Sequence, residues 1–361
     1  MVRFRIHLEP PPEEPKTIPS SIRILAFNIT DKCNLGCLHC FAQDNRSEMT
    51  TEECKEVILQ AKTARCVRVI LCGKEPLMRE DIFEILNYIK ERGMDVELMT
   101  NGTLITQETL ELLKAAGVSK VQISIDGFKS THDELRCMDG AYDLAYNSVK
   151  LLIANGFSPS INTVVLKENM NELPDLLNSL ILDFPVLDEL RLSRLIPSRF
   201  NNPDYEYFEV YKNTIKNVAA FLLTLDRPFH IEIEDNPIVF NEILPPELKK
   251  LVSYTPCGVI THTIDVLNNG DVVFCVPMGS HSQSVIHGNI LKEGLENIIS
   301  RVRKYKDNDV DDSVCRSCEF CRIMCLGGWR CVAFAYRQNE YLADPFCPRV
   351  REALEKKLKG L

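Results

Sequence analysis

The stretch Cys33-Asn34-Leu35-Gly36-Cys37-Leu38-His39-Cys40 places three thiols at the spacing C-x3-C-x2-C. Thiolates are the usual protein ligands of iron–sulfur clusters, and a 4Fe–4S cluster ordinarily takes four of them. This stretch supplies three, so one iron would stay open to a substrate or cofactor, as a catalytic zinc ion keeps an open position. A zinc knuckle or a set of buried structural thiols is the alternative for an isolated triplet.

Strand-like and helix-like segments alternate around this stretch. It directly follows an apolar run at residues 24–29 that is typical of a buried strand. Further strand-like runs lie at 67–71, 96–99, 121–125, 160–166 and 190–195, and helical segments at 50–62, 79–92, 106–116, 141–154, 172–182 and 205–225. This alternation predicts an α/β fold with a parallel sheet. Six strand–helix pairs fall short of a full barrel, and the periodicity alone does not separate an open barrel from a doubly wound sheet.

With the motifs described next, the cysteine stretch resembles the radical S-adenosylmethionine (SAM) superfamily. In that family the open iron chelates SAM, and an electron from the reduced cluster cleaves the sulfonium. The resulting 5′-deoxyadenosyl radical abstracts hydrogen from a substrate. The resemblance implies an enzyme, a radical SAM oxidoreductase. It also implies a partial (β/α)6 TIM-type barrel over residues 23–235, with the cysteines at its carboxyl face.

The second strand is followed by Cys72-Gly73-Lys74-Glu75-Pro76. This run is similar to the family's Gly-Gly-Glu-Pro stretch, which holds the SAM amino group and so implies roles for Gly73 and Glu75. A carboxylate facing an ammonium group makes a charge-assisted hydrogen bond. Lys74 replaces the family's second glycine, and lysine resists backbone conformations that glycine permits.

The next strand ends carry further matches. Thr100-Asn101-Gly102 resembles the family's turn near the cofactor, which implies that Asn101 lies close to SAM. Residues 124–136 resemble the family's run from Ser-x-Asp-Gly to Arg, with Ser124 and Arg136 implied at the SAM ribose or carboxylate. Cys137 stands where that run usually has glycine. We expect His132 to be a structural hydrogen-bonding group rather than an acid or base.

The resemblance implies three more cofactor contacts. His39 occupies the position of an aromatic residue that packs on adenine, and Phe41 lies next to it. Arg194 could contact a cofactor or substrate carboxylate, or form a surface ion pair. Asn162 on the fifth strand faces either the core or the pocket.

Cysteine is unevenly distributed along the chain. Of 15 cysteines, three belong to the opening stretch and four are scattered (Cys54, Cys66, Cys72 and Cys137). We expect the scattered thiols to be small buried apolar groups. The other eight follow residue 250: Cys257, Cys275, Cys315, Cys318, Cys321, Cys325, Cys331 and Cys347. Such clustering indicates metal sites, since a disulfide framework belongs to short secreted chains.

The late cysteines resemble a SPASM domain, which carries two auxiliary 4Fe–4S clusters. The resemblance implies Cys315, Cys318, Cys325 and Cys347 for one cluster and Cys257, Cys275 and Cys331 for the other. Cys321 is then spare or a fourth ligand, and a pair of zinc sites is the alternative. Residues 268–271 predict a β-hairpin turn between strands at 263–267 and 272–276.

These assignments divide the 361 residues into an N-terminal extension (1–22), the barrel (23–235), the SPASM domain (236–347) and a C-terminal helix (348–361). The net charge of −9, without a cationic stripe, argues against a nucleic-acid partner. Apolar runs fall short of the roughly 18 residues of a membrane span. The N-terminus also lacks the apolar core of a signal peptide, so we expect a cytoplasmic protein.

The substrate is the least determined property. We expect a peptide or protein substrate, as in ribosomal-peptide or sulfatase maturases, with a tetrapyrrole, haem or other cofactor precursor as the alternative. We expect no leader-recognition domain in the 32 residues before Cys33, which are too few for one. This expectation weakens the case for a peptide substrate relative to a cofactor precursor. A non-catalytic iron–sulfur electron carrier is a third possibility, and the SAM-pocket residues argue against it. We expect a reductant such as ferredoxin or flavodoxin. Asp235, His262 and Tyr336 are polar candidates for an acid or base, and the motifs select none of them.

Overall fold

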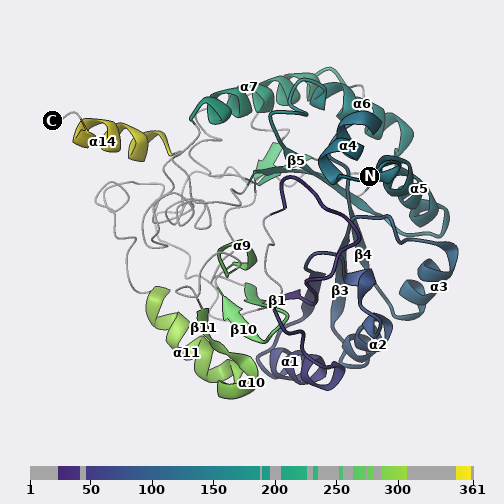
Figure 1. Cartoon of the computed structure of the whole chain (residues 1–361), viewed down its shortest axis with the longest axis vertical. Coiled ribbons are helices and arrows are strands. Elements are labelled where there is room, and N and C mark those ends of the chain that lie inside the picture. The colour runs from purple at the N-terminus through teal and green to yellow at the C-terminus, as the bar shows by residue number, and fades with distance from the viewer. Residues whose placement is uncertain are drawn as a thin grey trace.

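The structure is a computed structural model that describes residues 23–40, 46–187, 189–195, 205–225, 231–234, 252–254, 263–273, 275–279, 286–306 and 347–358. A sheet of eleven strands runs through these residues in the order β11-β10-β9-β1-β2-β3-β4-β5-β6-β7-β8. Figure 1 shows the sheet curved into an arc, with most of the helices on its outer side.

The six predicted strands form the middle of this sheet. They are β1 (Ile24–Asn28), β2 (Arg68–Cys72), β3 (Asp95–Thr100), β4 (Lys120–Ser124), β5 (Ser160–Val165) and β6 (Glu189–Arg194). Each pairs in parallel with the next one along the chain. The predicted partial barrel is therefore confirmed.

The sheet also extends past both ends of the predicted barrel. Strands β7 (Ile231–Glu234) and β8 (Val252–Tyr254) continue the parallel order after β6. The predicted hairpin is formed by β9 (Thr263–Val266) and β10 (Asp271–Val273), and β11 (Ile286–Asn289) pairs with β10. Strand β9 also pairs in parallel with β1. One sheet thus crosses the sequence boundary expected at residue 235.

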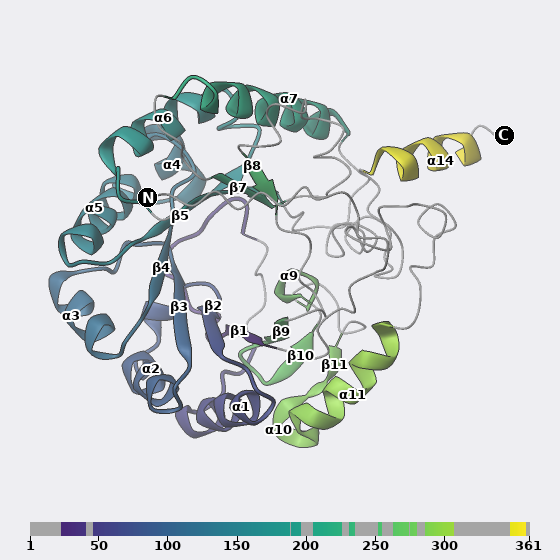
Figure 2. The ribbon, with the colours of Figure 1, turned by 180° about the vertical axis from the view of Figure 1, so that it is seen from behind.

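Helices cover the outside of the sheet. Between β1 and β7 they are α1 (Thr51–Thr63), the short η1 (Pro76–Met78), α2 (Ile82–Glu91), α3 (Gln107–Ala115), α4 (Lys129–Arg136), α5 (Ala141–Ala154), α6 (Leu173–Asp183) and α7 (Tyr205–Leu222). After β10 come α9 (Val276–Gly279), α10 (Ile290–Glu293), α11 (Leu295–Lys306) and α14 (Pro348–Leu358). Figure 2 shows α1–α7 as an arc, with α10 and α11 beside α1. Among the helices that the structure describes, none has the length and hydropathy of a membrane span.

The two faces of the strands differ in polarity. Most side chains that point outward from β1–β5 are apolar and buried, for example Leu25, Phe27 and Leu98, and they belong to the main core with the helices. Inward positions carry charged and amide groups. Lys120 lies 3.9 Å from Glu97 and 3.6 Å from Glu189. Burial of charge is tolerated because these groups pair with one another, so the barrel has a polar interior beneath its carboxyl face.

Candidate cofactor and cluster site

A cavity of about 930 Å³ opens at the carboxyl ends of the strands. The segment between β1 and α1 (residues 29–50, called the cysteine loop below) contributes three thiols to the cavity lining, those of Cys33, Cys37 and Cys40. Six of the eight residues predicted to contact the cofactor line the same cavity: His39, Gly73, Asn101, Ser124, Arg136 and Arg194. Phe41 lies outside the described residues. Residues more than 150 positions apart are therefore gathered at one edge of the sheet, the edge that binds ligands in folds of this class.

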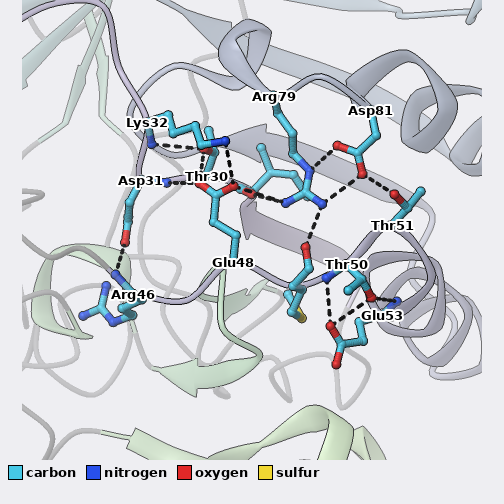
Figure 3. Close-up of polar contacts among 12 residues, drawn as sticks. Thr30, Asp31, Lys32, Arg46, Glu48, Thr50, Thr51, Glu53, Arg79 and Asp81 are labelled. Carbon is cyan, nitrogen blue, oxygen red and sulfur yellow. Dashed lines mark hydrogen bonds and ion pairs between the residues drawn. The ribbon is translucent and has the colours of Figure 1, made fainter.

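The cysteine loop leaves β1 and returns to α1, and one side chain ties both of its ends (Figure 3). The Arg79 guanidinium donates to the Ile29 carbonyl oxygen at 3.0 Å and to the Met49 carbonyl oxygen at 2.8 Å. It also donates to both carboxylate oxygens of Asp81, at 2.6 and 3.0 Å. Arg79 is buried. Arginine suits this position because its planar fork carries several donors at fixed angles.

A second contact closes the loop inside the Arg79 bonds. The Glu48 carboxylate accepts hydrogen bonds from the Thr30 hydroxyl and from the Asp31 N–H. The Asp31 carboxylate in turn accepts from the Arg46 N–H at 3.1 Å. Figure 3 shows these residues side by side between β1 and α1. Residues 30 and 31 at the start of the cysteine loop are thus hydrogen-bonded to residues 46 and 48 near its end.

The same loop is bonded to the C-terminal hairpin. The Met49 N–H donates to the Asn268 carbonyl oxygen, and Arg46 Nη2 donates to the Gly279 carbonyl oxygen, both at 2.8 Å. Gly279 ends α9, which begins one residue after Cys275. The loop that carries the first three cysteines is therefore connected to the region of a predicted auxiliary-cluster ligand.

Gly73 allows the turn that follows β2 to lie close against the start of the cysteine loop. Its φ is +127°, and a Cβ there would lie 2.6 Å from the Thr30 carbonyl oxygen. Lys74 has no positive φ, and its N–H donates to that same oxygen at 3.1 Å. The substitution of lysine for the family's second glycine is accommodated because only Gly73 takes the unusual conformation.

Glu75 is fully buried and is not among the residues that line the cavity. Its carboxylate accepts from the Thr100 hydroxyl and the Asn101 N–H at 2.8 Å, and from the Leu77 N–H at 3.1 Å. Burial raises the pKa of the Glu75 carboxyl, and these three donors oppose that shift. The side chain therefore holds the turn that presents Asn101, while the neighbouring Gly73 and Lys74 face the cavity.

Two cofactor-site residues reach the thiols directly. Asn101 Nδ2 lies 3.9 Å from Cys33 Sγ, and Arg136 Nη1 lies 3.7 Å from Cys37 Sγ. Burial raises the pKa of both thiols, and Arg136 opposes the rise at Cys37. Hydrogen bonds donated to the cysteine sulfurs help to set the reduction potential of a bound iron–sulfur cluster.

Asp126 joins the cysteine loop, α4 and β5. Its Oδ2 lies 2.5 Å from Arg136 Nη2 and 3.4 Å from His39 Nε2, and its Oδ1 accepts from the Val164 N–H at 2.9 Å. Burial alone would raise the pKa of this carboxyl, but Arg136, the two histidines His39 and His132 and the Val164 N–H together outweigh burial, and the pKa is lowered. The Asp126 N–H donates to His132 Nδ1 at 3.0 Å, a structural contact of the kind expected for His132.

The described residues fit a cluster better than a single metal ion. No three Cys, His, Asp or Glu side chains among them come together so as to hold one ion. Three thiols on one loop, facing one cavity, suit a cluster whose irons each take a separate thiolate. None of the nine cysteines in the described ranges forms a disulfide. The cavity lies near the upper end of the ~300–1,000 Å³ range of ligand sites, so SAM and part of a substrate fit beside a cluster.

The predicted late ligands lie mostly outside the described residues. This applies to Cys257, Cys315, Cys318, Cys321, Cys325 and Cys331, and to the acid–base candidates Asp235, His262 and Tyr336. Cys275 is partly buried and Cys347 is buried. The assignment of the late cysteines to two clusters stays a prediction.

On β5 and β6 the sequence predicts one cofactor or substrate contact, Arg194, and does not decide whether Asn162 faces the core or the pocket. In the structure Asn162, Arg191 and Ser193 line the cavity, and Asn162 accepts a hydrogen bond from the Ser193 hydroxyl at 2.7 Å. Arg191 is held by Glu189 at 2.9 Å and Glu232 at 3.1 Å. Every second residue of a strand faces the same side, so strand alternation would have placed Arg191 and Ser193 together on the inward face of β6.

Comparison with protein families finds two matches. Residues 27–180 match the model described as "Radical SAM superfamily", and residues 257–322 match the SPASM model, described as "Iron-sulfur cluster-binding domain". A curated "AdoMet-dependent heme synthase" from Methanosarcina barkeri is 41% identical over 351 residues, covering 90% of this chain and 96% of that protein. "Mycofactocin maturase MftC" from Mycolicibacterium smegmatis is 27% identical, covering 84% and 77%.

Solved structures share the fold. SuiB from Streptococcus suis, bound to its precursor peptide SuiA, aligns with a TM-score of 0.71 at 19% identity, covering 91% of this chain and 76% of that one. The structure titled "Native anSMEcpe with bound AdoMet" aligns at 0.69 with 20% identity, covering 94% and 97%. At these identities the likeness concerns architecture alone.

Replacing Arg79 should disrupt the cysteine loop. We expect Arg79→Met to lower the free energy of unfolding by about 2–5 kcal/mol, because it leaves the Ile29 and Met49 carbonyl oxygens without their donor. It should also lower the iron bound per chain, because both loop ends lose a donor. Thermal unfolding and iron analysis measure the two effects. Lys55→Met is the matched control, since Lys55 pairs with Glu52 and Glu84 at the surface. A variant with wild-type melting and iron content would contradict the role of Arg79.

Stability should depend on pH through His132. Burial lowers the pKa of His132 to about 4 from 6.5. The unfolded chain therefore takes up the proton first, and stability falls as pH drops from about 6.5 towards 4. We expect this group to cost the wild type roughly 2–3 kcal/mol between pH 7.5 and 4.5. His132→Gln, which keeps an acceptor for Asp126, should lack that part of the loss. Urea unfolding of the cluster-free chains measures it, and parallel pH profiles would refute the assignment.

Proposed function

Because this chain belongs to the radical SAM superfamily, as its sequence predicted, and carries a SPASM region, we propose that it uses SAM to convert a tetrapyrrole precursor to haem. It is an enzyme of the radical SAM oxidoreductase class, with 4Fe–4S clusters and SAM as its cofactors. The substrate is the part that is proposed. From the sequence alone a peptide ranked narrowly ahead of a tetrapyrrole, and we now place the tetrapyrrole first.

The observation that carries this proposal is the extent of one similarity. The haem-forming relative matches at 41% identity along 96% of its length, whereas the peptide maturase matches at 27% along 77%. Two partial relatives also carry tetrapyrrole names, "Fe-coproporphyrin III synthase" and "Pre-heme d1 synthase", at 33% and 30% identity. Those two are covered over less than half their length, so they add weight only to the substrate class.

The charge of the cavity suits an anionic tetrapyrrole. Its lining includes five cationic side chains, Lys32, Lys74, Arg136, Arg191 and Arg194, and one carboxylate, Asp31. Haem precursors carry several carboxylate side chains on an apolar ring. Arginine binds carboxylates through paired hydrogen bonds, and Met78, Met99, Val164 and Leu195 give the same cavity apolar surface for a ring.

The residues divide the cavity into two sides. Cys33, Cys37 and Cys40 would hold the cluster, and Gly73, Asn101 and Ser124, which line the same cavity, would contact SAM beside it. The bound cluster and SAM together supply a 5′-deoxyadenosyl radical that abstracts hydrogen, after a reductant such as ferredoxin or flavodoxin has delivered one electron. Arg191 on β6 would hold a substrate carboxylate and so fix which carbon of the substrate faces SAM.

Peptide modification is the second candidate function. It rests on the similarity to the mycofactocin maturase over 84% of this chain. A peptide would occupy the same cavity through its backbone amides and any acidic side chain. The two candidates therefore differ in substrate and share the cofactor chemistry.

Turnover with a defined tetrapyrrole tests the proposal. The anaerobically reconstituted enzyme receives SAM, dithionite and Fe-coproporphyrin III, and products are followed by liquid chromatography with mass spectrometry. We expect a new haem product, and 5′-deoxyadenosine well above the substrate-free level. The matched control is binding of the methyl ester of the same porphyrin, measured without reductant, because the ester keeps the ring and removes the charges that the cavity cations would bind.

The outcome separates the two candidates. Two results together would overturn the tetrapyrrole proposal. The first is that neither Fe-coproporphyrin III nor metal-free coproporphyrin raises 5′-deoxyadenosine above the substrate-free level. The second is that the enzyme converts a precursor peptide encoded beside this gene. Equal affinity for the free acid and the methyl ester would contradict the role given to Arg191.

A further inference from the structure

Arg136 connects a fixed positive charge to one thiol of the cysteine loop. Its Nη1 lies 3.7 Å from Cys37 Sγ, and its Nη2 lies 2.5 Å from Asp126 Oδ2. The side chain is about 10% exposed, so water screens the charge weakly. Arginine keeps its charge at every working pH. A permanent cation is therefore held beside a predicted cluster ligand.

The backbone fixes this contact. Arg136 is the last residue of α4, and the neighbouring Leu135 carbonyl oxygen accepts from the Leu38 N–H at 2.9 Å. Leu38 lies between Cys37 and Cys40, so the end of the helix is bonded to the cysteine loop itself. Cys137 then ends the helix in a left-handed conformation with φ of 54°. The helix end and the loop hold the guanidinium at Cys37 through main-chain geometry.

The thiols of Cys33 and Cys37 have different surroundings. Cys33 Sγ accepts from neutral donors, the Leu35 N–H at 3.4 Å and Asn101 Nδ2 at 3.9 Å. Cys37 Sγ faces the cation. Hydrogen bonds and net charge at the cysteine sulfurs are two of the levers that set the reduction potential of a cluster. Of these two thiols, Cys37 is therefore the one at which a nearby charge acts on the cluster.

We propose that the Arg136–Asp126 pair sets the reduction potential of the cluster at Cys33, Cys37 and Cys40. Reduction adds negative charge to the cluster. A cation beside Cys37 stabilises the reduced form more than the oxidised form and raises the potential, while the Asp126 carboxylate behind it offsets part of that effect. Arg136 is thus a positioning residue for electron uptake, in addition to the SAM contact expected from the sequence. This inference goes beyond the proposed substrate and does not depend on it.

Opposite charge changes give opposite predictions. Arg136→Gln keeps a donor near Cys37 and removes the cation, so we expect a more negative potential. Asp126→Asn keeps the shape of the side chain and removes the offsetting anion, so we expect a more positive potential. Lys129→Gln is the matched control, because Lys129 is an exposed cation at the other end of α4 that pairs with Asp143 and Asp133. Its potential should equal that of the wild type.

The measurement is a redox titration of the reconstituted full chain, followed by electron paramagnetic resonance without SAM. Leaving SAM out separates a direct effect at Cys37 from an altered SAM contact. The barrel-cluster signal is the one missing from a Cys33→Ala, Cys37→Ala, Cys40→Ala chain. Shifts of opposite sign in Arg136→Gln and Asp126→Asn support the proposal. Wild-type potentials in both, or shifts of the same sign, overturn it. If Arg136→Gln binds no cluster, the sign of the Asp126→Asn shift decides.

Discussion

The interaction on which the site depends is the set of hydrogen bonds from the Arg79 guanidinium to both ends of the cysteine loop. A loop of this length has many conformations, and fixing its ends removes much of that freedom before any cluster is present. Arg79 donates to the Ile29 and Met49 carbonyl oxygens, and Glu48 pairs the two arms beyond them. The cost of burying the guanidinium is offset by the Asp81 carboxylate. The three thiols therefore start from a closed loop.

Paired charges recur throughout the interior of the barrel. Arg136 is paired with Asp126 at the cysteine loop, and Arg191 with Glu189 and Glu232 at the opposite wall. A buried charge is expensive unless a partner and further hydrogen bonds satisfy it. Each cation that faces the cavity in these pairs is anchored from behind by a carboxylate, which fixes its direction as well as its charge. Such anchoring suits a site that must orient SAM and a substrate against one iron atom.

The sequence predicted the gathering of residues better than their orientation. Strand alternation predicted six parallel strands, and the strand-end motifs predicted cofactor contacts of which six of eight line the cavity, because both depend on local patterns. Glu75 was expected to face SAM, and its carboxylate faces Thr100 and Asn101, an arrangement that no spacing rule reveals.

Strands β7 and β8 are too short to give a clear pattern. The parallel pairing of β9 with β1 joins residues almost 240 positions apart, and local periodicity carries no information about it. Arg191 and Ser193 were not predicted to contact a ligand, because the resemblance of their run assigned a contact to Arg194 alone.

The central claim is that the loop of Cys33, Cys37 and Cys40 holds a cluster with one iron free of protein ligands, so that SAM binds there and is cleaved. Formation of 5′-deoxyadenosine by a chain with all three cysteines changed to serine tests it most directly. The account predicts that this chain keeps iron bound by its later cysteines and releases no 5′-deoxyadenosine from SAM and dithionite, while the wild type does so readily. Wild-type cleavage of SAM by the triple variant would contradict the account.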